Sequence, residues 1–164
     1  KAAFEHSCPV SIKYPKGVEG EFADDTFDLS AACIRQGKDV TLISYGIMIN
    51  EALKAADMLL DAGTEAEVIK INRLDKFDIQ TVYTSAAKTG RVVVLEDCVR
   101  AGCLGEYIAS ELAGNGADIM LLNFQESFSE VGTTPQNYRL HGLDAQSVYS
   151  SVMSAINNKN REGI

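Results

Sequence analysis

From Lys38 onward, short apolar runs alternate with longer segments in which apolar residues recur every three or four positions. Residues 40–46 (VTLISYG) and 91–97 (RVVVLED) are typical of strands, whereas residues 50–63 (NEALKAADMLLDAG) have the period of an amphipathic helix. Parallel neighbours in a sheet need a crossover connection, which a helix supplies. The alternation therefore predicts a three-layer α/β/α sandwich around a mostly parallel five-stranded sheet.

Capping residues mark the expected helix ends. Asn50 is placed to cap the first helix and Gly63 to end it, and Asp78 and Gly90 do the same for the next one. Asp144 is expected to begin the last helix. The remaining predicted elements are strands at 66–71 and 118–124, helices at 102–116 and 144–156, and an irregular loop before the last helix.

Two segments depart from the repeat. Gly37 and Lys38 form a predicted tight turn between two extended runs, which places an antiparallel edge strand beside residues 40–45. Residues 1–25 contain a possible last helical turn (AAFEH), a possible strand (PVSIKY) and a polar, glycine-containing connector. We therefore expect residues 1–25 to be the tail of a preceding domain plus a linker, and residues 26–164 to be one domain.

Composition argues against several classes of partner. The chain has 15 basic and 23 acidic residues, so it lacks the positive face that nucleic-acid binding requires. It also lacks an apolar run of the roughly 20 residues that cross a bilayer. Because the sequence starts with lysine and shows no leader pattern, we expect a fragment of a cytoplasmic protein, and its four cysteines are expected to be buried or half-buried free thiols.

The loops that follow the strands are poor in catalytic groups. The sequence contains no nucleophile elbow and no phosphate-binding loop, and a surface or structural role is expected for both His6 and His141. Acids such as Glu65 and Glu67 are expected to be solvated. No catalytic residue is therefore expected in these loops, and no metal-binding cluster is indicated by the sequence.

One loop could bind a ligand. In residues 96–107 (EDCVRAGCLGEY) a buried strand ends in two acids, and a glycine-containing turn begins a helix whose free N–H groups could hold an anion. This interpretation makes Gly102, Cys103 and Gly105 a possible anion-binding turn. The alternative is that the glycines only allow the turn to pack tightly.

These motifs, in this order, resemble those of the carboxy-terminal domain of the transketolase superfamily. The strand ending Tyr-Gly at 45–46, the acid pair and glycine turn at 96–105, and Gly-Leu-Asp before the last helix all have counterparts there. Residues 13–17 (KYPKG) resemble the Arg-Tyr-Pro-Arg-Gly linker of the 1-deoxy-D-xylulose-5-phosphate synthase branch. The resemblance is therefore strongest to that branch.

The resemblance implies a parent enzyme that uses thiamine diphosphate and Mg²⁺ to join a two-carbon unit from pyruvate to glyceraldehyde 3-phosphate. The cofactor would lie on an N-terminal and a pyrimidine-binding domain outside this chain, which would itself be an inactive scaffold within a homodimer. Lys13, and less directly Lys16, would contact the substrate phosphate as point charges.

Two alternatives remain open. The chain could come from a transketolase or from a pyruvate dehydrogenase beta subunit, because the resemblance covers a domain that these enzymes share. It could also be a stand-alone module that binds anions at the glycine turn.

Overall fold

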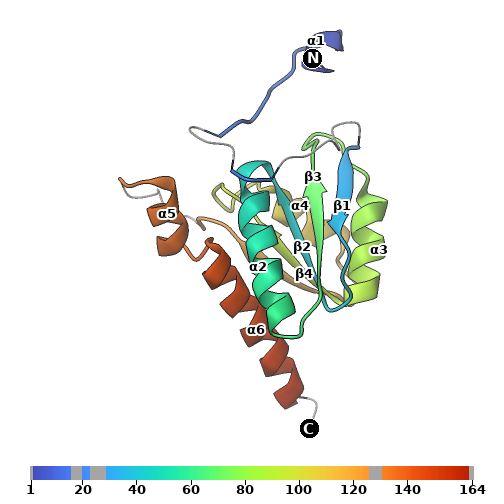
Figure 1. Ribbon diagram of the computed structural model, residues 1–164. Helices are drawn as coiled ribbons and strands as arrows, with labels where there is room; N and C mark the ends of the chain where they lie inside the picture. Colours follow the sequence, from blue (N-terminus) through green and yellow to red (C-terminus); the bar gives the residue numbers. More distant parts are fainter. Residues whose placement is uncertain (1, 16–19, 23–28, 126–130, 163–164) are drawn as a thin grey trace.

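The computed structural model describes residues 2–15, 20–22, 29–125 and 131–162, and it contains a five-stranded sheet (Figure 1). The strands lie in the order β1-β3-β2-β4-β5, where β1 is antiparallel to β3 and all other neighbours are parallel. The predicted architecture is confirmed. The strands are β1 (Ala31–Arg35), β2 (Val40–Tyr45), β3 (Ala66–Ile71), β4 (Arg91–Leu95) and β5 (Asp118–Leu122).

Helices cover both faces of the sheet. One apolar cluster joins the sheet to α2 and α6, and the other joins it to α3 and α4. Within β2, Leu42 belongs to the first cluster and Ile43 to the second, as the alternation of side chains along a strand requires. The helices are α1 (Ala2–Glu5), the 3₁₀ turn η1 (Gly46–Met48), α2 (Ile49–Asp61), α3 (Ile79–Thr89), α4 (Leu104–Glu111), α5 (Thr134–Leu140) and α6 (Ala145–Glu162).

Most predicted helix ends are confirmed. Asp78 accepts a hydrogen bond from the Gln80 N–H at the start of α3, and Gly90 ends that helix in the left-handed conformation. Gly63, also left-handed, follows α2. The prediction that Asn50 caps α2 is wrong, because η1 leads directly into the helix and Asn50 lies inside its first turn.

The antiparallel edge strand exists, but its predicted partner is wrong. β1 pairs with β3 rather than with β2, so the connection from β1 to β2 passes over the end of β3. Gly37 makes this crossing possible, since a Cβ atom there would lie 2.2 Å from the backbone of Ala66 and Glu67. Lys38 and Asp39 both donate backbone N–H bonds to the Glu65 carbonyl at the same place.

Two further local predictions need correction. Residues 9–14 form no strand, and the apolar side chains of Val10 and Ile12 are exposed. The loop predicted after β5 contains α5, whose start is fixed by reciprocal hydrogen bonds between Thr133 and Gln136. The last helix is confirmed, with Val148 and Val152 fully buried against α2 and the sheet.

Candidate functional site

The strand order of the sheet has a topological switch point between the neighbouring strands β2 and β4. The strand β3 lies on one side of β2, whereas β4 and β5 follow on the other. In open α/β sheets the crevice at the carboxyl ends of the strands, at such a switch point, is the usual ligand site. Tyr45 ends β2, and Glu96 and Asp97 follow β4, so these residues define the candidate site.

Lys13 lies directly over this crevice. Its Nζ donates to the Asp97 carbonyl at 3.0 Å and to the Tyr45 hydroxyl at 3.4 Å, and it stands 4.8 Å from the centroid of the Tyr45 ring. The lysine comes from the N-terminal arm, a name we use for the described residues 2–15 and 20–22. An arm residue and two strand ends, separated by up to 84 positions in the sequence, are thereby brought together.

Asp97 connects this crevice to α5. Its Oδ2 accepts a hydrogen bond of 2.9 Å from the hydroxyl of the buried Tyr138. Burial, together with the neighbouring charge of Asp97, raises the pKa of Tyr138 above its ordinary value, so the hydroxyl stays a donor. The backbone of Asp97 thus holds the arm, while its side chain holds α5.

The helix start at the predicted anion-binding turn is filled by the chain itself. Glu96 is 1% exposed, and its two carboxylate oxygens accept from the N–H groups of Leu104 at 2.9 Å and Gly105 at 2.7 Å. The Gly102 N–H donates to Glu106, and the Cys103 N–H donates to the Arg100 carbonyl.

An added anion would have to displace Glu96 or Glu106 from these N–H groups. Gly105 also has a packing role, because a Cβ atom there would lie 2.8 Å from a Glu96 oxygen. The geometry therefore favours the packing interpretation of the glycine turn. Anion binding by Gly102, Cys103 and Gly105 stays a prediction.

A hollow of about 530 Å³ opens beside the crevice. Its walls combine aromatic and aliphatic side chains from the loops after β3 and β4 with those of Tyr45 and α4. Phe77 and Tyr107 meet edge to face with ring centroids 5.9 Å apart, and Tyr107 is half exposed. The hollow is large enough for a small organic molecule, and Asp75 and Lys76 place two charged side chains on its wall.

Cys98 is one of the residues that line this hollow. Burial and the adjacent Glu96 carboxylate raise the pKa of the Cys98 thiol to about 11, so it stays protonated near neutral pH. The four cysteines are free, but Cys8 and Cys33 are exposed, against the prediction of buried or half-buried thiols. A neutral Cys98 thiol argues against a nucleophilic role.

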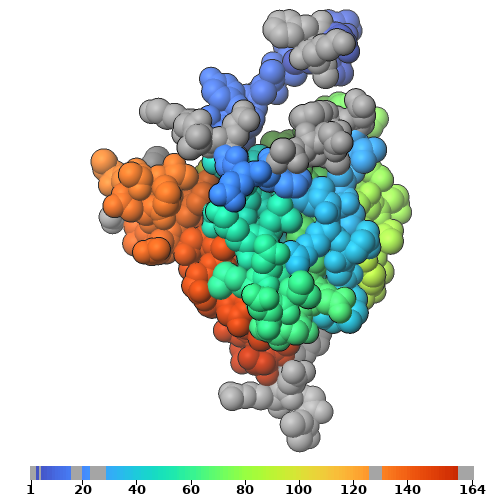
Figure 2. All heavy atoms as spheres, in the orientation of Figure 1, coloured from blue at the N-terminus to red at the C-terminus, as the bar shows by residue number. Residues whose placement is uncertain are grey.

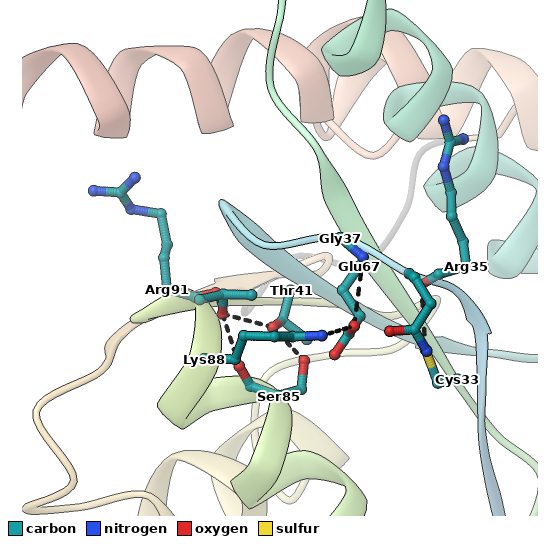
Figure 3. A network of polar contacts seen from close by, with 10 residues as sticks. Cys33, Arg35, Gly37, Thr41, Glu67, Ser85, Lys88 and Arg91 are labelled. Atoms are coloured by element: carbon teal, nitrogen blue, oxygen red, sulfur yellow. Dashed lines mark hydrogen bonds and ion pairs between the residues drawn. The ribbon is translucent and has the colours of Figure 1, made fainter.

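A second polar cluster lies at the opposite, amino-terminal edge of the sheet (Figure 3). Glu67, which was expected to be solvated, is 4% exposed and pairs with Lys88. Burial acts to raise the pKa of Glu67, but hydrogen bonds from Lys88, Ser85 and the Gly37 N–H outweigh it and hold that pKa below the ordinary range. Nearby, Thr41 joins its hydroxyl to that of Ser85 at 2.6 Å.

This amino-edge cluster has a structural role. It ties the end of α3 to β2, β3 and the crossing at Gly37, and Figure 3 shows Glu67 pointing toward Lys88 between these elements. Sequence reasoning missed it because only pairing across the sheet brings its members together. No single sequence motif indicates this cluster.

Lys16 and His141 are two other residues considered from the sequence. Lys16 lies outside the described residues. His141 packs edge-on against Phe124 with ring centroids 4.9 Å apart, and this contact fits a structural role. Its Nε2 is buried without a hydrogen-bond partner. Among the described residues, no group of three or more His, Cys, Asp or Glu side chains could hold a metal ion.

The fold and its carboxyl edge define a class: a doubly wound α/β domain in which side chains of the chain itself occupy the usual ligand crevice. Comparison with known families identifies it further. Residues 30–148 match the model described as "Transketolase, C-terminal domain". The chain belongs to this family, which is found in thiamine diphosphate-dependent enzymes.

The chain is also similar to individual proteins. The chain is 34% identical over 160 residues to a 6-deoxy-6-sulfo-D-fructose transketolase subunit of Clostridium sp. (strain MSTE9), covering 94% of this chain and 49% of the relative. It is 31% identical over 163 residues to 1-deoxy-D-xylulose-5-phosphate synthase of Desulforudis audaxviator (strain MP104C), covering 94% of this chain and 26% of that enzyme.

Among solved structures, a split-gene transketolase described as an inactive beta4 tetramer superposes with a TM-score of 0.72 at 29% identity. The match covers 88% of this chain and 47% of that one. The chain thus spans half or less of the length of these relatives. None of its described helices is long and apolar enough to cross a membrane.

Proposed function

We propose that this chain is the carboxy-terminal domain of a thiamine diphosphate-dependent 1-deoxy-D-xylulose-5-phosphate synthase, with residues 1–25 as the tail of a preceding pyrimidine-binding domain plus a linker. The parent enzyme condenses pyruvate with glyceraldehyde 3-phosphate, releases CO₂ and feeds isoprenoid synthesis. Bound on the other domains, the cofactor would supply the carbanion chemistry. The residues described here would bind and position the acceptor and scaffold a homodimer.

The placement of Lys13 is the observation that carries this proposal. The resemblance of the linker motif implies a contact between Lys13 and the substrate phosphate. The placement of Lys13 supports this, because the ammonium lies at the carboxyl edge of the sheet, where ligands bind in open α/β folds. An ammonium has three N–H donors, and the hydrogen bonds described for Lys13 engage two of them, with the Asp97 carbonyl and the Tyr45 hydroxyl. The third could meet a phosphate oxygen.

The test uses the complete enzyme and two acceptors that differ only in the phosphate. Loss of a charge-assisted hydrogen bond costs about 1.5–3 kcal/mol, so Lys13→Met should raise the KM for glyceraldehyde 3-phosphate roughly 10- to 150-fold. The KM for unphosphorylated glyceraldehyde should stay constant, and Lys13→Arg should retain function. Equal effects on both acceptors would refute the phosphate contact.

A transketolase parent is the second candidate. It is favoured by the sulfosugar transketolase subunit and the split-gene transketolase, since this chain covers about half of each but only a quarter of the synthase. An anionic acceptor would suit Lys13 in this case too. Release of CO₂ from pyruvate by the complete enzyme supports the synthase, whereas turnover only with a ketose donor supports the transketolase.

A further inference from the structure

The N-terminal arm contacts the domain at a second place besides Lys13. The Asn50 Oδ1 accepts backbone N–H bonds from Glu21 at 3.1 Å and from Phe22 at 3.0 Å. The Asn50 Nδ2 donates to the Ile47 carbonyl at 3.0 Å, which fixes the orientation of the amide. Asn50 therefore uses its side chain to hold the arm instead of capping its own helix.

Gly20 completes this contact from the side of the arm. Its φ is +88°, and a Cβ atom there would lie 2.5 Å from the Asn50 Nδ2 and 2.7 Å from its Cγ. No other residue type could bring the backbone this close without displacing Asn50. The Lys70 ammonium lies 5.9 Å from the Phe22 ring centroid and adds a contact to the same segment.

Both contacts are made with one short stretch of the domain. Tyr45, which contacts Lys13, ends β2, and Asn50 lies in the first turn of α2, so only η1 and one residue separate them. In Figure 2 the blue residues of the arm lie over this end of α2 and the sheet. The arm is thus held on both sides of the β2–α2 junction.

We propose that Asn50, together with Gly20, is a positioning residue that fixes the register of the arm and thereby holds Lys13 over the crevice. Its consequence for catalysis rests on the proposed function of Lys13. The positioning itself does not, because it can be measured on this chain alone.

Acetylation of lysines by N-hydroxysuccinimidyl acetate gives the measurement. The amine attacks the ester carbonyl, N-hydroxysuccinimide leaves and a proton is released, so an amine held in contacts reacts slowly. Since one hydrogen bond contributes about 0.5–1.5 kcal/mol, Asn50→Ala should raise the acetylation rate of Lys13 roughly 2- to 12-fold. The exposed Lys54 on α2 is the internal reference and should not change.

Three further variants make the test specific. Gly20→Ala should release Lys13 to the same degree. Because this substitution lies in the arm, it leaves the sequence of α2 unchanged and so controls for any effect of Asn50→Ala on that helix. Glu21→Ala keeps the backbone N–H and should leave Lys13 as slow as in the wild type. Asn50→Asp keeps acceptor oxygens for the arm but sets a carboxylate oxygen against the Ile47 carbonyl, so it should release Lys13 less than Asn50→Ala does. The proposal is overturned if Lys13 reacts at the wild-type rate in both Asn50→Ala and Gly20→Ala.

In the complete enzyme, both releasing variants should raise the KM for the phosphorylated acceptor and leave kcat unchanged. If Lys13 is released but this KM stays constant, the positioning stands and the phosphate contact of Lys13 fails. The two proposals therefore fail on different readouts.

Discussion

Replacement of Lys88 by methionine tests whether Glu67 is ionised inside the folded domain. The Glu67 side chain is 5% exposed and that of Lys88 is 39% exposed, so the variant keeps the volume but leaves the carboxylate with Ser85 and the Gly37 N–H. Breaking a fully buried pair costs about 3–5 kcal/mol. Because water reaches Lys88, we expect about 1–3 kcal/mol here, a fall in Tm of roughly 2–12 °C.

The contribution of Glu67 to stability should change with pH in a defined direction. In the wild type, the pKa of Glu67 is below its ordinary value, so its contribution to stability is present above the unfolded pKa of about 4.3 and is lost as pH falls through the folded pKa. Without Lys88, burial prevails and raises that pKa, so the variant regains stability by protonating Glu67. The Tm difference from wild type should therefore shrink between pH 7 and pH 5.

Thermal unfolding followed by circular dichroism at both pH values measures these differences. Lys54→Met is the matched control, because Lys54 forms an exposed pair with Glu51 at 3.7 Å and its loss should change stability by no more than about 0.5 kcal/mol. A Tm for Lys88→Met equal to that of the wild type at pH 7 would refute the reasoning. So would a difference that grows on acidification.

Two substitutions and one labelling experiment probe the carboxyl edge. Glu96→Gln should lower the free energy of unfolding by about 2–4 kcal/mol in denaturant titrations, because an amide N–H₂ would face the Leu104 or Gly105 N–H; a loss below 1 kcal/mol would contradict the capping role. Gly105→Ala should cost about 1–3 kcal/mol through overpacking, and an unchanged midpoint would count against the close contact. Cys98 should react with iodoacetamide at pH 8 more slowly than the exposed Cys8, and equal rates would show that its thiol is not suppressed.

Local patterns in the sequence were sufficient to predict the layers of this fold. Apolar periodicity marks strands and helices, and a cap such as Asp78 with a stop such as Gly90 acts within a few residues of its own position. The pairing of β1 with β3 depends on contacts between segments more than 30 residues apart. Such a choice leaves no signal in either segment.

At the candidate site, too, local features could be predicted from the sequence, whereas contacts between distant segments could not. The loop around Glu96 could be identified because it follows a buried strand, but the sequence did not show that this acid would cap α4 itself. Asn50 has the residue type of a helix cap, and only the path of the arm reveals its other partners. Glu67 looked like a surface acid because its partner Lys88 belongs to another element.

The cap formed by Glu96 also bears on how such a domain can be reused. Related sheets leave the corresponding helix start open for a dinucleotide phosphate, whereas here the positive end of α4 is neutralised from within. The N–H groups of Leu104 and Gly105 therefore need no added anion as a partner. Because both partners of this cap lie within one domain, a change in the domains joined to it would leave the pairing of Glu96 with α4 intact.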